Sequence, residues 1–543
     1  MSAGPVTSAR IGGHVVADTL QGLGAQVAFG VPGIHALAIW EALRTSPITV
    51  YGTRTELCAG FAADGYARST GRPAPLLLST GPGALNSLTA VMEAASSHVP
   101  VVAISSQIPS ELLGRGRGYL HELPDQLASF APLVKHAERA ATAEAIPEVL
   151  ARAWRIALTA PSGPVYVEIG VDLLNGDTEG MPVTAAVSEA PPRVPAPAAQ
   201  VASAAAELQR AERPVIWAGG GVIRSQAQGE LRELAQRLGA PVATTYMGKG
   251  ALSDDHPLAA GCGCDEAAFQ ELLAGADVVV CVGTELGAET TGQYALRFGG
   301  RVIQIDAAPE RIGATYAAVG LVGDARETLR ALLHELEPAR SSDGPERVAA
   351  LRARVRAGLE TQGRELELGL LETIERALPV GAITVWDMTI LGYWAAPHLR
   401  LGADQQFLYP LGSGTLGYAW PAAIGASVAN PDRPVLAVVG DGGVQYALAE
   451  LGTAAQHGVN AALLIVDDGG YGILREYQRH AFGQTTSVEL PGADLAAIAA
   501  GFGVPVELAT PEDLGERLQW ALTRAGPAVV VLRARIAAAQ PTA

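Results

Sequence analysis

Several features that would place a chain among secreted, membrane or zinc-binding proteins are scarce in this sequence. Four cysteines stand among 543 residues, at Cys58, Cys262, Cys264 and Cys281. They are too few for a disulfide framework and predict a reducing, cytoplasmic compartment. The pair at 262 and 264 has no second pair of ligands at the spacing of a zinc site. No apolar run reaches the length of a membrane span, and the first residues lack the pattern of a signal peptide.

Positive charge is also in short supply. The formal net charge is -17, which argues against nucleic acid or an acidic membrane surface as a partner. What the chain does have is a large apolar fraction, 49% of its residues, and 63 glycines. Its length suffices for about three domains. We therefore expect a soluble intracellular protein of several domains.

Strand-like apolar runs alternate with helical segments along the whole chain. The runs lie at 27–29, 74–78, 99–104, 163–169, 214–218, 278–282, 301–305, 434–439 and 461–466. Such alternation predicts parallel sheets with right-handed crossovers. The Pro- and Ala-rich stretch 189–197 indicates an extended linker. The prediction is an α/β fold of three domains, at 1–180, 198–337 and 365–537, each with a central parallel sheet flanked by helices.

Two of these apolar runs end in acidic, glycine-rich turns. Val439-Gly440-Asp441-Gly442-Gly443 closes one run, and Asp467-Asp468-Gly469-Gly470-Tyr471-Gly472 closes the next. The carboxyl ends of parallel strands meet at one edge of a sheet, where ligands of open α/β sheets bind. Carboxylate oxygens beside amide-rich turns suit Mg²⁺ that grips a diphosphate. An acidic turn with no ligand is the alternative interpretation.

A Gly-Asp-Gly turn that is followed further along the chain by a polar doublet resembles the diphosphate-binding motif of thiamine diphosphate (ThDP) enzymes. The resemblance implies that Mg²⁺ is held by Asp441, Asp468 and the carbonyl of Gly470. It also implies that the cofactor is contacted by Gly440, Gly442, Gly443, Tyr471 and Gly472. The family usually has Asn-Asn where Asp467-Asp468 stands. The acidic doublet adds negative charge beside a polyanion.

The stretch from Tyr51 to Arg68 resembles the start of the helix that activates the cofactor in the same family. There a Glu enters from the other chain of a dimer and hydrogen-bonds ring N1′, which supports the imine form of the aminopyrimidine. By position this residue is Glu56, and we assign Pro32 and Asn86 to the same cofactor site. A surface Glu favoured by the helix macrodipole is the alternative.

The glycine-rich segment 411–425 resembles the family stretch that bends the cofactor. By position Leu416 is the apolar wedge between the two rings, and the carbonyl of Gly414 holds the 4′-amino group. Such a segment can instead pack a helix on a sheet, with Leu416 in the core.

The resemblance covers the whole chain and implies a pyrimidine-binding, a middle and a diphosphate-binding domain. In this family the active site lies between the first domain of one subunit and the third of its neighbour. A homodimer is therefore obligatory, and a homotetramer is common. The middle domain carries Gly219-Gly220-Gly221 after a strand. Acetolactate synthases bind FAD in this domain, but homologous decarboxylases have the same glycines without it, so FAD is not favoured.

The common first step of these enzymes is attack on a 2-oxo acid with loss of CO₂. His35 and His121 are candidates to deliver the proton that ends a decarboxylation, because imidazoles titrate near neutrality. Acetolactate synthases usually lack His at position 35, whereas benzaldehyde lyase and guanidino-oxoacid decarboxylase-like proteins have one. Residues expected to line the substrate pocket with them are Ile34, Gln126 and Leu474. A structural role for either His, as a cap or a core hydrogen-bonder, is the alternative.

Glu285 and Glu289 stand where acetolactate synthases place arginines. The absence of these arginines weakens the case for an anionic second substrate. A carboxylate at the pocket can instead pair with a cationic substrate tail, as in 5-guanidino-2-oxopentanoate decarboxylase. Solvated loop carboxylates are the alternative. We expect ThDP- and Mg²⁺-dependent decarboxylation of a 2-oxo acid, with or without carboligation. An acetolactate synthase-type carboligase and a non-catalytic ThDP-binding or regulatory homologue remain alternatives.

Overall fold

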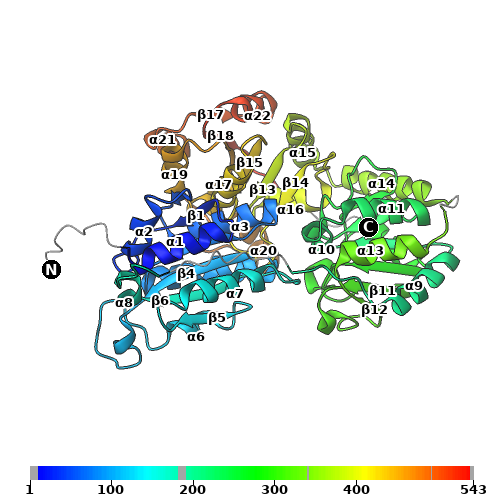
Figure 1. Cartoon of the computed structure of the whole chain (residues 1–543). Coiled ribbons are helices and arrows are strands. Elements are labelled where there is room, and N and C mark those ends of the chain that lie inside the picture. The colour runs from blue at the N-terminus through cyan, green and yellow to red at the C-terminus, as the bar shows by residue number, and fades with distance from the viewer. Residues whose placement is uncertain (1–9, 182–190, 339–341, 491, 539–543) are drawn as a thin grey trace. The chain divides into compact units, whose positions relative to one another are not determined.

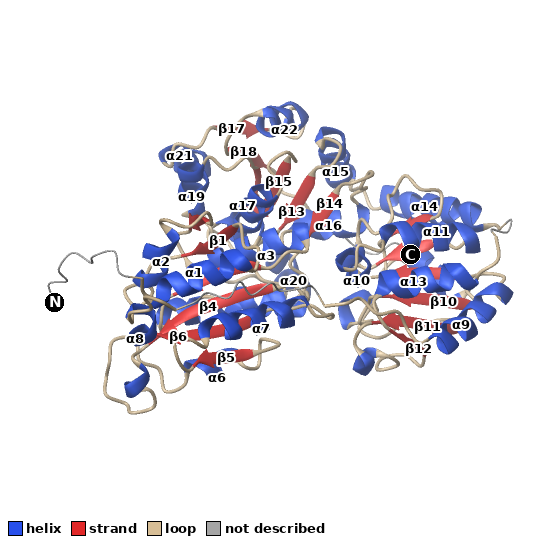
Figure 2. Ribbon diagram, viewed as in Figure 1, coloured by secondary structure: helices blue, strands red, loops and turns tan. Residues whose placement is uncertain are grey.

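The computed structural model describes residues 10–181, 191–338, 342–490 and 492–538, and its strands form three six-stranded sheets (Figures 1 and 2). Every strand pairing within these sheets is parallel. The predicted α/β fold with three sheet-centred domains is therefore confirmed. By contacts the chain divides into two compact units, Met1–Pro191 with Gly412–Pro431 and Ala447–Asn460, and Pro192–Leu411 with Asp432–Tyr446 and Ala461–Ala543.

The first sheet has the order β2-β1-β3-β4-β6-β5. Its strands are β1 (Val27–Gly30), β2 (Thr49–Gly52), β3 (Ala74–Leu78), β4 (Val101–Gln107), β5 (Ala137–Ala140) and β6 (Val165–Gly170). One face packs on α1 (Gly12–Gly22), α2 (Leu37–Leu43), α7 (Ile146–Leu158) and α8 (Val171–Asn175). The other face packs on α3 (Glu56–Thr70), α4 (Pro82–Asn86), α5 (Leu88–Ser96) and α6 (Gln126–Phe130). Because both faces are covered, the inner strands are continuous apolar runs.

The second sheet has the order β12-β11-β10-β7-β8-β9. Its strands are β7 (Val215–Ala218), β8 (Val242–Thr244), β9 (Ala259–Gly261), β10 (Val278–Val282), β11 (Arg301–Asp306) and β12 (Val319–Val322). The helices α9 (Ala198–Arg210), α10 (Gly220–Arg224), α11 (Gln228–Leu238) and α13 (Ala325–Glu335) cover one face, and α12 (Ala267–Ala274) packs on the other. Read from β9, this is the strand order 3-2-1-4-5-6 of dinucleotide-binding folds.

The third sheet has the order β14-β13-β15-β16-β18-β17, which repeats the order of the first. Its strands are β13 (Ile383–Trp386), β14 (Gln406–Leu408), β15 (Val435–Gly440), β16 (Ala462–Asp467), β17 (Val506–Ala509) and β18 (Ala528–Arg533). The helices α15 (Glu365–Ala377), α16 (Ile390–His398) and α22 (Leu514–Thr523) share one core with it. The remaining helices are α14 (Gly344–Thr361), which precedes this domain, and α18 (Asp441–Val444), α20 (Gly472–Phe482) and α21 (Leu495–Gly501).

Two helices from the third predicted domain pack with the first sheet instead. They are α17 (Ala419–Ala429) and α19 (Glu450–His457). A Cβ on Gly65 would lie 2.0 Å from the carbonyl oxygen of Ala422, and one on Gly425 would lie 1.9 Å from that of Ala62. Glycine at both positions therefore lets α3 and α17 cross at backbone contact. The domain boundaries read from the sequence stay a prediction.

Residues 191–197 have no regular structure until α9 begins, and the first two residues of the predicted linker, 189 and 190, lie outside the described residues. The N-terminal stretch that lacks a signal pattern lies outside them as well, up to residue 9. Within the described part of the chain, no helix has the length and apolarity that crossing a membrane requires.

Candidate active site

The structure brings the two predicted metal ligands together at the carboxyl edge of the third sheet. Asp441 follows β15 and begins the single-turn helix α18, and Asp468 follows the neighbouring strand β16. The main-chain N–H of Asp468 donates to Oδ1 of Asp441 at 3.4 Å. In this sheet the chain changes direction between β13 and β15, and ligands of open α/β sheets bind at such a switch point.

Glycines allow the second turn to fold back on itself. Gly470 has φ of 156°, and a Cβ there would lie 2.1 Å from the carbonyl oxygen of Val488. A Cβ on Gly472 would lie 2.0 Å from Oδ2 of Asp468. Glycine at 470 therefore lets the turn pass close to Val488, and glycine at 472 lets the Asp468 carboxylate lie against the first turn of α20, where helical N–H groups favour negative charge.

Negative charge is concentrated at this edge. Burial, and next the charge of Asp468, raise the pKa of Asp441 to about 6. Burial also raises the pKa of Asp468, against the effect of Arg475. The buried Oδ1 of Asp468 accepts no hydrogen bond from any residue that the structure describes. Two crowded carboxylates, one with a free oxygen, are the environment that a cation stabilises.

No cluster of three acidic, His or Cys side chains that suits a metal occurs among the described residues. A metal at this edge would therefore need a main-chain oxygen besides Asp441 and Asp468, as the resemblance implies for Gly470. The donor set of two carboxylates and a carbonyl consists of hard oxygens and fits Mg²⁺. These residues would hold the metal and, through it, the diphosphate.

Arg475 on α20 is a partner that the sequence analysis missed. Its side chain is 7% exposed, and its Nη2 lies 3.8 Å from Oδ1 of Asp468. Its Nε donates to Glu489 at 2.8 Å. A cation at this place offsets the charge that Asp468 adds where the family usually has Asn. The available signal in the sequence was an Arg seven residues after Asp468.

The structure also brings Glu56 and Asn86 together. Thr55 caps α3 by accepting from the N–H of Cys58, so Glu56 is the first residue of the helix. The amide Nδ2 of Asn86 donates to Oε2 of Glu56 at 3.3 Å. A Cβ on Gly83 would lie 3.2 Å from the other carboxylate oxygen. The half-buried carboxylate is thus held at a helix start with one donor beside it.

The segment around Gly414 is anchored by a buried acid. Ser413 donates to Oε2 of Glu93 from its main-chain N–H at 2.7 Å and from its hydroxyl at 2.8 Å. Gly414 then adopts φ of 68° and is exposed, and Leu416 is half-buried. Glu93 is fully buried on α5 and also accepts from Arg68 at 3.2 Å. Sequence reasoning missed Glu93; the available signal was an acidic residue within the apolar stretch 88–96.

His35 and His121 form a pair. Their ring centroids lie 5.2 Å apart in an edge-to-face arrangement, and Tyr119 lies 5.6 Å from His35. The Nδ1 atom of each imidazole is buried and lacks a hydrogen-bond partner among the residues described. Burial, and next the neighbouring His121, lower the pKa of His35. Neither Nδ1 is therefore engaged in a hydrogen bond within the described part of the chain.

The remaining apolar candidates are on the surface of their units. Pro32 and Ile34 are exposed in the turn after β1, Ile34 by 60%. Leu474 on α20 is 46% exposed.

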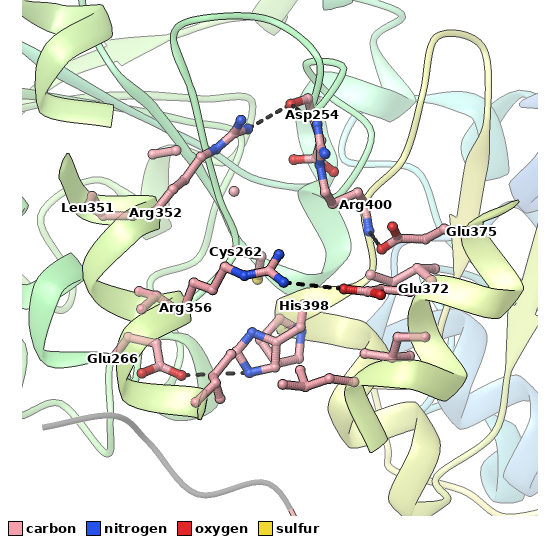
Figure 3. A pocket seen from close by; sticks show the side chains of 18 of the residues that line it. Asp254, Cys262, Glu266, Leu351, Arg352, Arg356, Glu372, Glu375, His398 and Arg400 are labelled. Atoms are coloured by element: carbon pink, nitrogen blue, oxygen red, sulfur yellow. Dashed lines mark hydrogen bonds and ion pairs between the residues drawn. The ribbon is translucent and has the colours of Figure 1, made fainter. Parts of the chain in front are cut away.

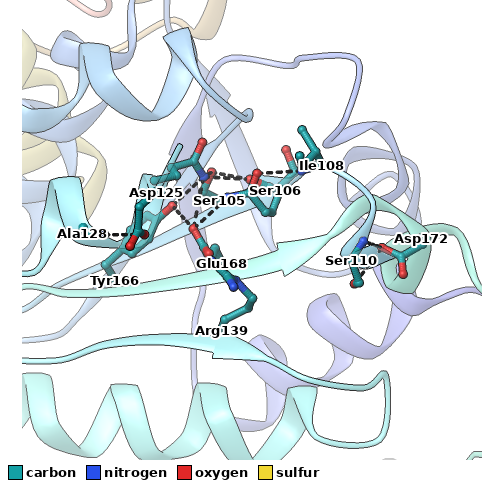
Figure 4. Close-up of polar contacts among 12 residues, drawn as sticks. Ser105, Ser106, Ile108, Ser110, Asp125, Ala128, Arg139, Tyr166, Glu168 and Asp172 are labelled. Carbon is teal, nitrogen blue, oxygen red and sulfur yellow. Dashed lines mark hydrogen bonds and ion pairs between the residues drawn. The ribbon is translucent and has the colours of Figure 1, made fainter. Parts of the chain in front are cut away.

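Gln126 does not fit the predicted contact with substrate, because it is fully buried. Its Oε1 accepts from the N–H of Gly81 at 2.7 Å, and its Nε2 donates to the hydroxyl of Tyr166 at 2.8 Å. Figure 4 shows the surrounding polar contacts, in which Glu168 pairs with Arg139 at 2.5 Å. Gln126 thus ties the Gly81 turn to the sheet interior.

The structure separates the two acids that were assigned to the substrate pocket. Oε1 of Glu285 pairs with Nη2 of Arg311 at 3.0 Å, so its charge is neutralised near the surface. Glu289 lines a cavity of about 220 Å³. The same cavity is lined by Asp265, by Ile473 on α20, and by the tyrosines Tyr246, Tyr393, Tyr409 and Tyr477. The cavity therefore borders the helix that begins at the predicted diphosphate site.

Two acids of this cavity, Asp265 and Glu289, lack a cation among the described residues. Tyr246 donates to Oδ2 of Asp265 at 3.3 Å. Burial, and also the negative charge of Glu289, raise the pKa of Asp265. No residue in the described part of the chain forms an ion pair with Asp265 or Glu289. Burial chiefly, together with charges that include Glu289, raises the pKa of Tyr393 to about 12. Two unpaired carboxylates among protonated phenols suit a cationic group.

Comparison with known proteins agrees with this arrangement. Residues 10–129 match the N-terminal TPP binding domain of the thiamine pyrophosphate enzymes, 201–332 match the central domain, and 387–532 match the C-terminal TPP binding domain. The chain belongs to the thiamine pyrophosphate enzyme family. It is a thiamine diphosphate-dependent enzyme of the 2-oxo acid decarboxylase and carboligase type, as the resemblance predicted.

Several curated relatives span nearly the whole chain. A protein of Pseudomonas aeruginosa named probable 2-ketoarginine decarboxylase is 38% identical over 93% of this chain and 90% of its own length. A probable acetolactate synthase large subunit of Methanocaldococcus jannaschii is 32% identical over 94% of this chain and 90% of its own length. The large subunit of acetolactate synthase isozyme 1 of Escherichia coli is 29% identical over 98% of this chain and 96% of its own length.

The glycines of the central domain of this thiamine pyrophosphate enzyme have a packing role. A Cβ on Gly219 would lie 2.2 Å from the carbonyl oxygen of Gly283, and one on Gly221 would lie 2.6 Å from its Cα. The turns after β7 and β10 therefore meet at the switch point of the second sheet. Close packing accounts for these glycines without a dinucleotide, and FAD stays unfavoured.

Proposed function

We propose that this enzyme decarboxylates a 2-oxo acid whose side chain ends in a cation, such as 5-guanidino-2-oxopentanoate, with ThDP and Mg²⁺. The observation that carries the proposal is the pair of unpaired carboxylates, Asp265 and Glu289, in the cavity beside α20. The relative named as a probable 2-ketoarginine decarboxylase supports the same chemistry.

A guanidinium is planar and weakly hydrated, so it binds carboxylates by charge-assisted hydrogen bonds and lies well against aromatic faces. The cavity offers both kinds of contact. A neutral side chain of equal length would leave both acids without a cationic partner. The carboxylates would thus select a cationic substrate over an apolar one and over a second anionic 2-oxo acid.

When bound, ThDP supplies a nucleophilic carbon and an electron sink for the bond to CO₂. Asp441, Asp468 and the carbonyl of Gly470 would hold the metal and the diphosphate. The carboxylate of Glu56 would hold a proton at the aminopyrimidine. The carbonyl of Gly414 and the side chain of Leu416 would fix the cofactor's conformation.

The His pair would manage the proton that replaces CO₂. His35 has a lowered pKa because of burial and of His121, which makes its imidazolium a stronger acid. The free Nδ1 atoms of the two rings give each a site to accept or donate a proton. Protonation of the carbon that has lost CO₂, rather than its attack on a second carbonyl, then yields an aldehyde.

The acetolactate synthase relatives keep carboligation as the second candidate. A non-catalytic role is disfavoured, because the chain keeps Glu56 and both metal carboxylates. We also propose the homodimer, with a homotetramer as the assembled form, and a cytoplasmic location, which accords with four buried cysteines that form no disulfide.

The test is a substrate panel on the enzyme loaded with ThDP and Mg²⁺. The panel consists of 5-guanidino-2-oxopentanoate, 2-oxohexanoate and pyruvate, with CO₂ release and product separation as readouts. The proposal requires highest kcat/KM on the guanidino acid and an aldehyde as product. Preference for pyruvate with formation of acetolactate would overturn it in favour of the carboligase. If no 2-oxo acid is turned over, the result would favour the non-catalytic ThDP-binding or regulatory homologue.

A further inference from the structure

Lysine is rare in this protein and occurs only at Lys135 and Lys249. Lys249 follows a short turn at 246–248 and is 5% exposed. Its Nζ lies over the ring of Phe407, 5.8 Å from the centroid. No hydrogen bond or ion pair joins its ammonium to any residue of the described part of the chain. Lys249 is thus a buried cation with no anion at ion-pair distance among the described residues. Its charge acts against the burial that raises the pKa of Glu375, but that carboxylate accepts from the N–H of Arg400.

A buried ammonium is costly unless it is paired, because it has lost its hydration. Other buried cations of this chain have an acidic partner, as Arg475 has Glu489 and Arg68 has Asp64. An unpaired Lys at such a place indicates that the partner comes from outside the chain.

Lys249 lines a cavity of about 770 Å³, which lies within one compact unit of the chain. The volume falls in the range of small-molecule sites. One wall is apolar and comes from α12, α14 and α15, with Phe269, Leu351, Val355, Leu359, Leu368 and Leu371. The cavity therefore joins a single buried cation to an extended apolar wall.

The charged groups at the rim largely satisfy one another. Figure 3 shows Arg356 facing Glu372, with Nη2 3.6 Å from the carboxylate, and Arg352 donating to the carbonyl oxygen of Asp254 at 2.7 Å. Glu375 accepts from the N–H of Arg400 at 2.7 Å.

The groups nearest Lys249 do not neutralise it. Burial, and next the charge of Lys249, lower the pKa of His398 to about 4, so this imidazole is neutral at physiological pH. His398 faces Glu266 at 3.7 Å. The Asp254 carboxylate accepts from the N–H of Leu401 at 2.8 Å. The buried carboxylates of the cavity are thus turned to other donors.

We propose that Lys249 anchors a second ligand site, which takes a small organic acid with an unbranched apolar body. The carboxylate pairs with Lys249, and the body lies along the wall of α12, α14 and α15. The site is separate from the substrate cavity but borders it, since Glu266, Pro397 and His398 line both.

The test compares three probes by calorimetry on the holoenzyme. Hexanoate has the carboxylate and the apolar body, hexylamine has the same body with the opposite charge, and inorganic phosphate is an anion without the body. Hexanoate should bind saturably, and the other two at least about tenfold more weakly. Equal binding of hexylamine, binding of phosphate alone, or no binding of hexanoate at about 10 mM would each overturn the proposal.

Variants locate the site. Lys249→Met removes the charge at similar volume and should weaken hexanoate at least about tenfold, whereas Lys249→Arg should retain it. Lys135→Met is the control, because Lys135 donates to the carbonyls of Ile156 and Thr159 in the other unit. Unchanged affinity in Lys249→Met would refute the assignment.

A second readout needs no variant, should Lys249→Met fail to fold. Reductive methylation of the native enzyme, followed by peptide mass spectrometry, reports on both lysines at once. Hexanoate should protect Lys249 at least about fivefold and leave Lys135 unchanged. Equal labelling of Lys249 with and without hexanoate would count against the site.

Discussion

The carboxylate of Glu93 receives two hydrogen bonds from one residue, Ser413, at 2.7 and 2.8 Å, across 320 positions of sequence. Its other oxygen accepts from Ser97 at 2.8 Å and from Arg68 at 3.2 Å. A buried carboxylate with several donors is rigid and costly to disturb. Glu93 therefore positions the segment that presents Gly414 and Leu416.

We expect Glu93→Gln to lower kcat about tenfold or more while the enzyme stays saturable with ThDP, because the amide has one acceptor and meets the Ser413 N–H with an unfavourable donor. Arg68 keeps its pair with Asp64 at 2.9 Å, which favours folding of the variant. Ser97→Ala is the matched control and should have little effect on kcat. A variant with lower thermal stability but normal kcat would show that Glu93 is only structural.

Glu56→Gln should keep cofactor binding and lose nearly all turnover, since a neutral amide does not support the proton shift in the aminopyrimidine. The direct measurement is hydrogen-deuterium exchange at C2 of the bound cofactor, which should slow by orders of magnitude. Asn86→Ala, which removes the donor at 3.3 Å, should have a smaller effect. Exchange at the parent rate in Glu56→Gln would remove Glu56 from the mechanism.

The metal site should tolerate an amide at 468 but not the loss of its oxygen. Asp468→Asn restores the usual residue of the family and keeps one ligand oxygen, so ThDP retention should persist. Arg475 retains Glu489 as a partner in that variant. Asp468→Ala and Asp441→Ala should lose the cofactor in gel filtration with Mg²⁺. Tolerance of Asp468→Ala combined with failure of Asp468→Asn would contradict the ligand assignment.

We expect Glu289 and Asp265, and not Glu285, to determine the preference for a cationic substrate. Because both acids are exposed to solvent at the cavity, Glu289→Gln with Asp265→Asn should lower kcat/KM for 5-guanidino-2-oxopentanoate about three- to tenfold and spare 2-oxohexanoate. Glu285→Gln is the matched control, since that carboxylate pairs with Arg311. An equal loss on both substrates, or the same loss in Glu285→Gln, would speak against the cation site.

Stability should fall in acid through His398. Burial holds its pKa near 4, against a usual value of 6.5. The unfolded chain thus binds this proton first, so the contribution is complete above pH 6.5 and is lost as pH falls toward 4. Linkage gives a loss of about 2 kcal/mol between pH 7 and pH 5. Urea unfolding at both values should show a smaller pH dependence for His398→Gln. The same dependence in parent and variant would exclude His398 as the cause.

The sequence alone was enough to predict the fold class and the two acidic turns of the candidate site. The long apolar strands, such as β10 and β16, and the glycine turns with Asp441 and Asp468 are local patterns. A buried parallel strand needs a continuous apolar run, and its end needs residues that turn. Short or mixed strands such as β2, β5 and β17 were not predicted, because their burial depends on neighbouring strands rather than on their own period.

Only the tertiary structure decided which polar residues are available to a ligand. Glu285 and Glu289 look alike in sequence, but Arg311 neutralises the first and leaves the second in the cavity. Gln126 proved to be committed to Gly81, and Glu93 to Ser413. The physical reason is that local patterns follow from each residue's own conformational and hydrophobic preferences, whereas the role of a polar side chain depends on partners that folding brings from distant positions.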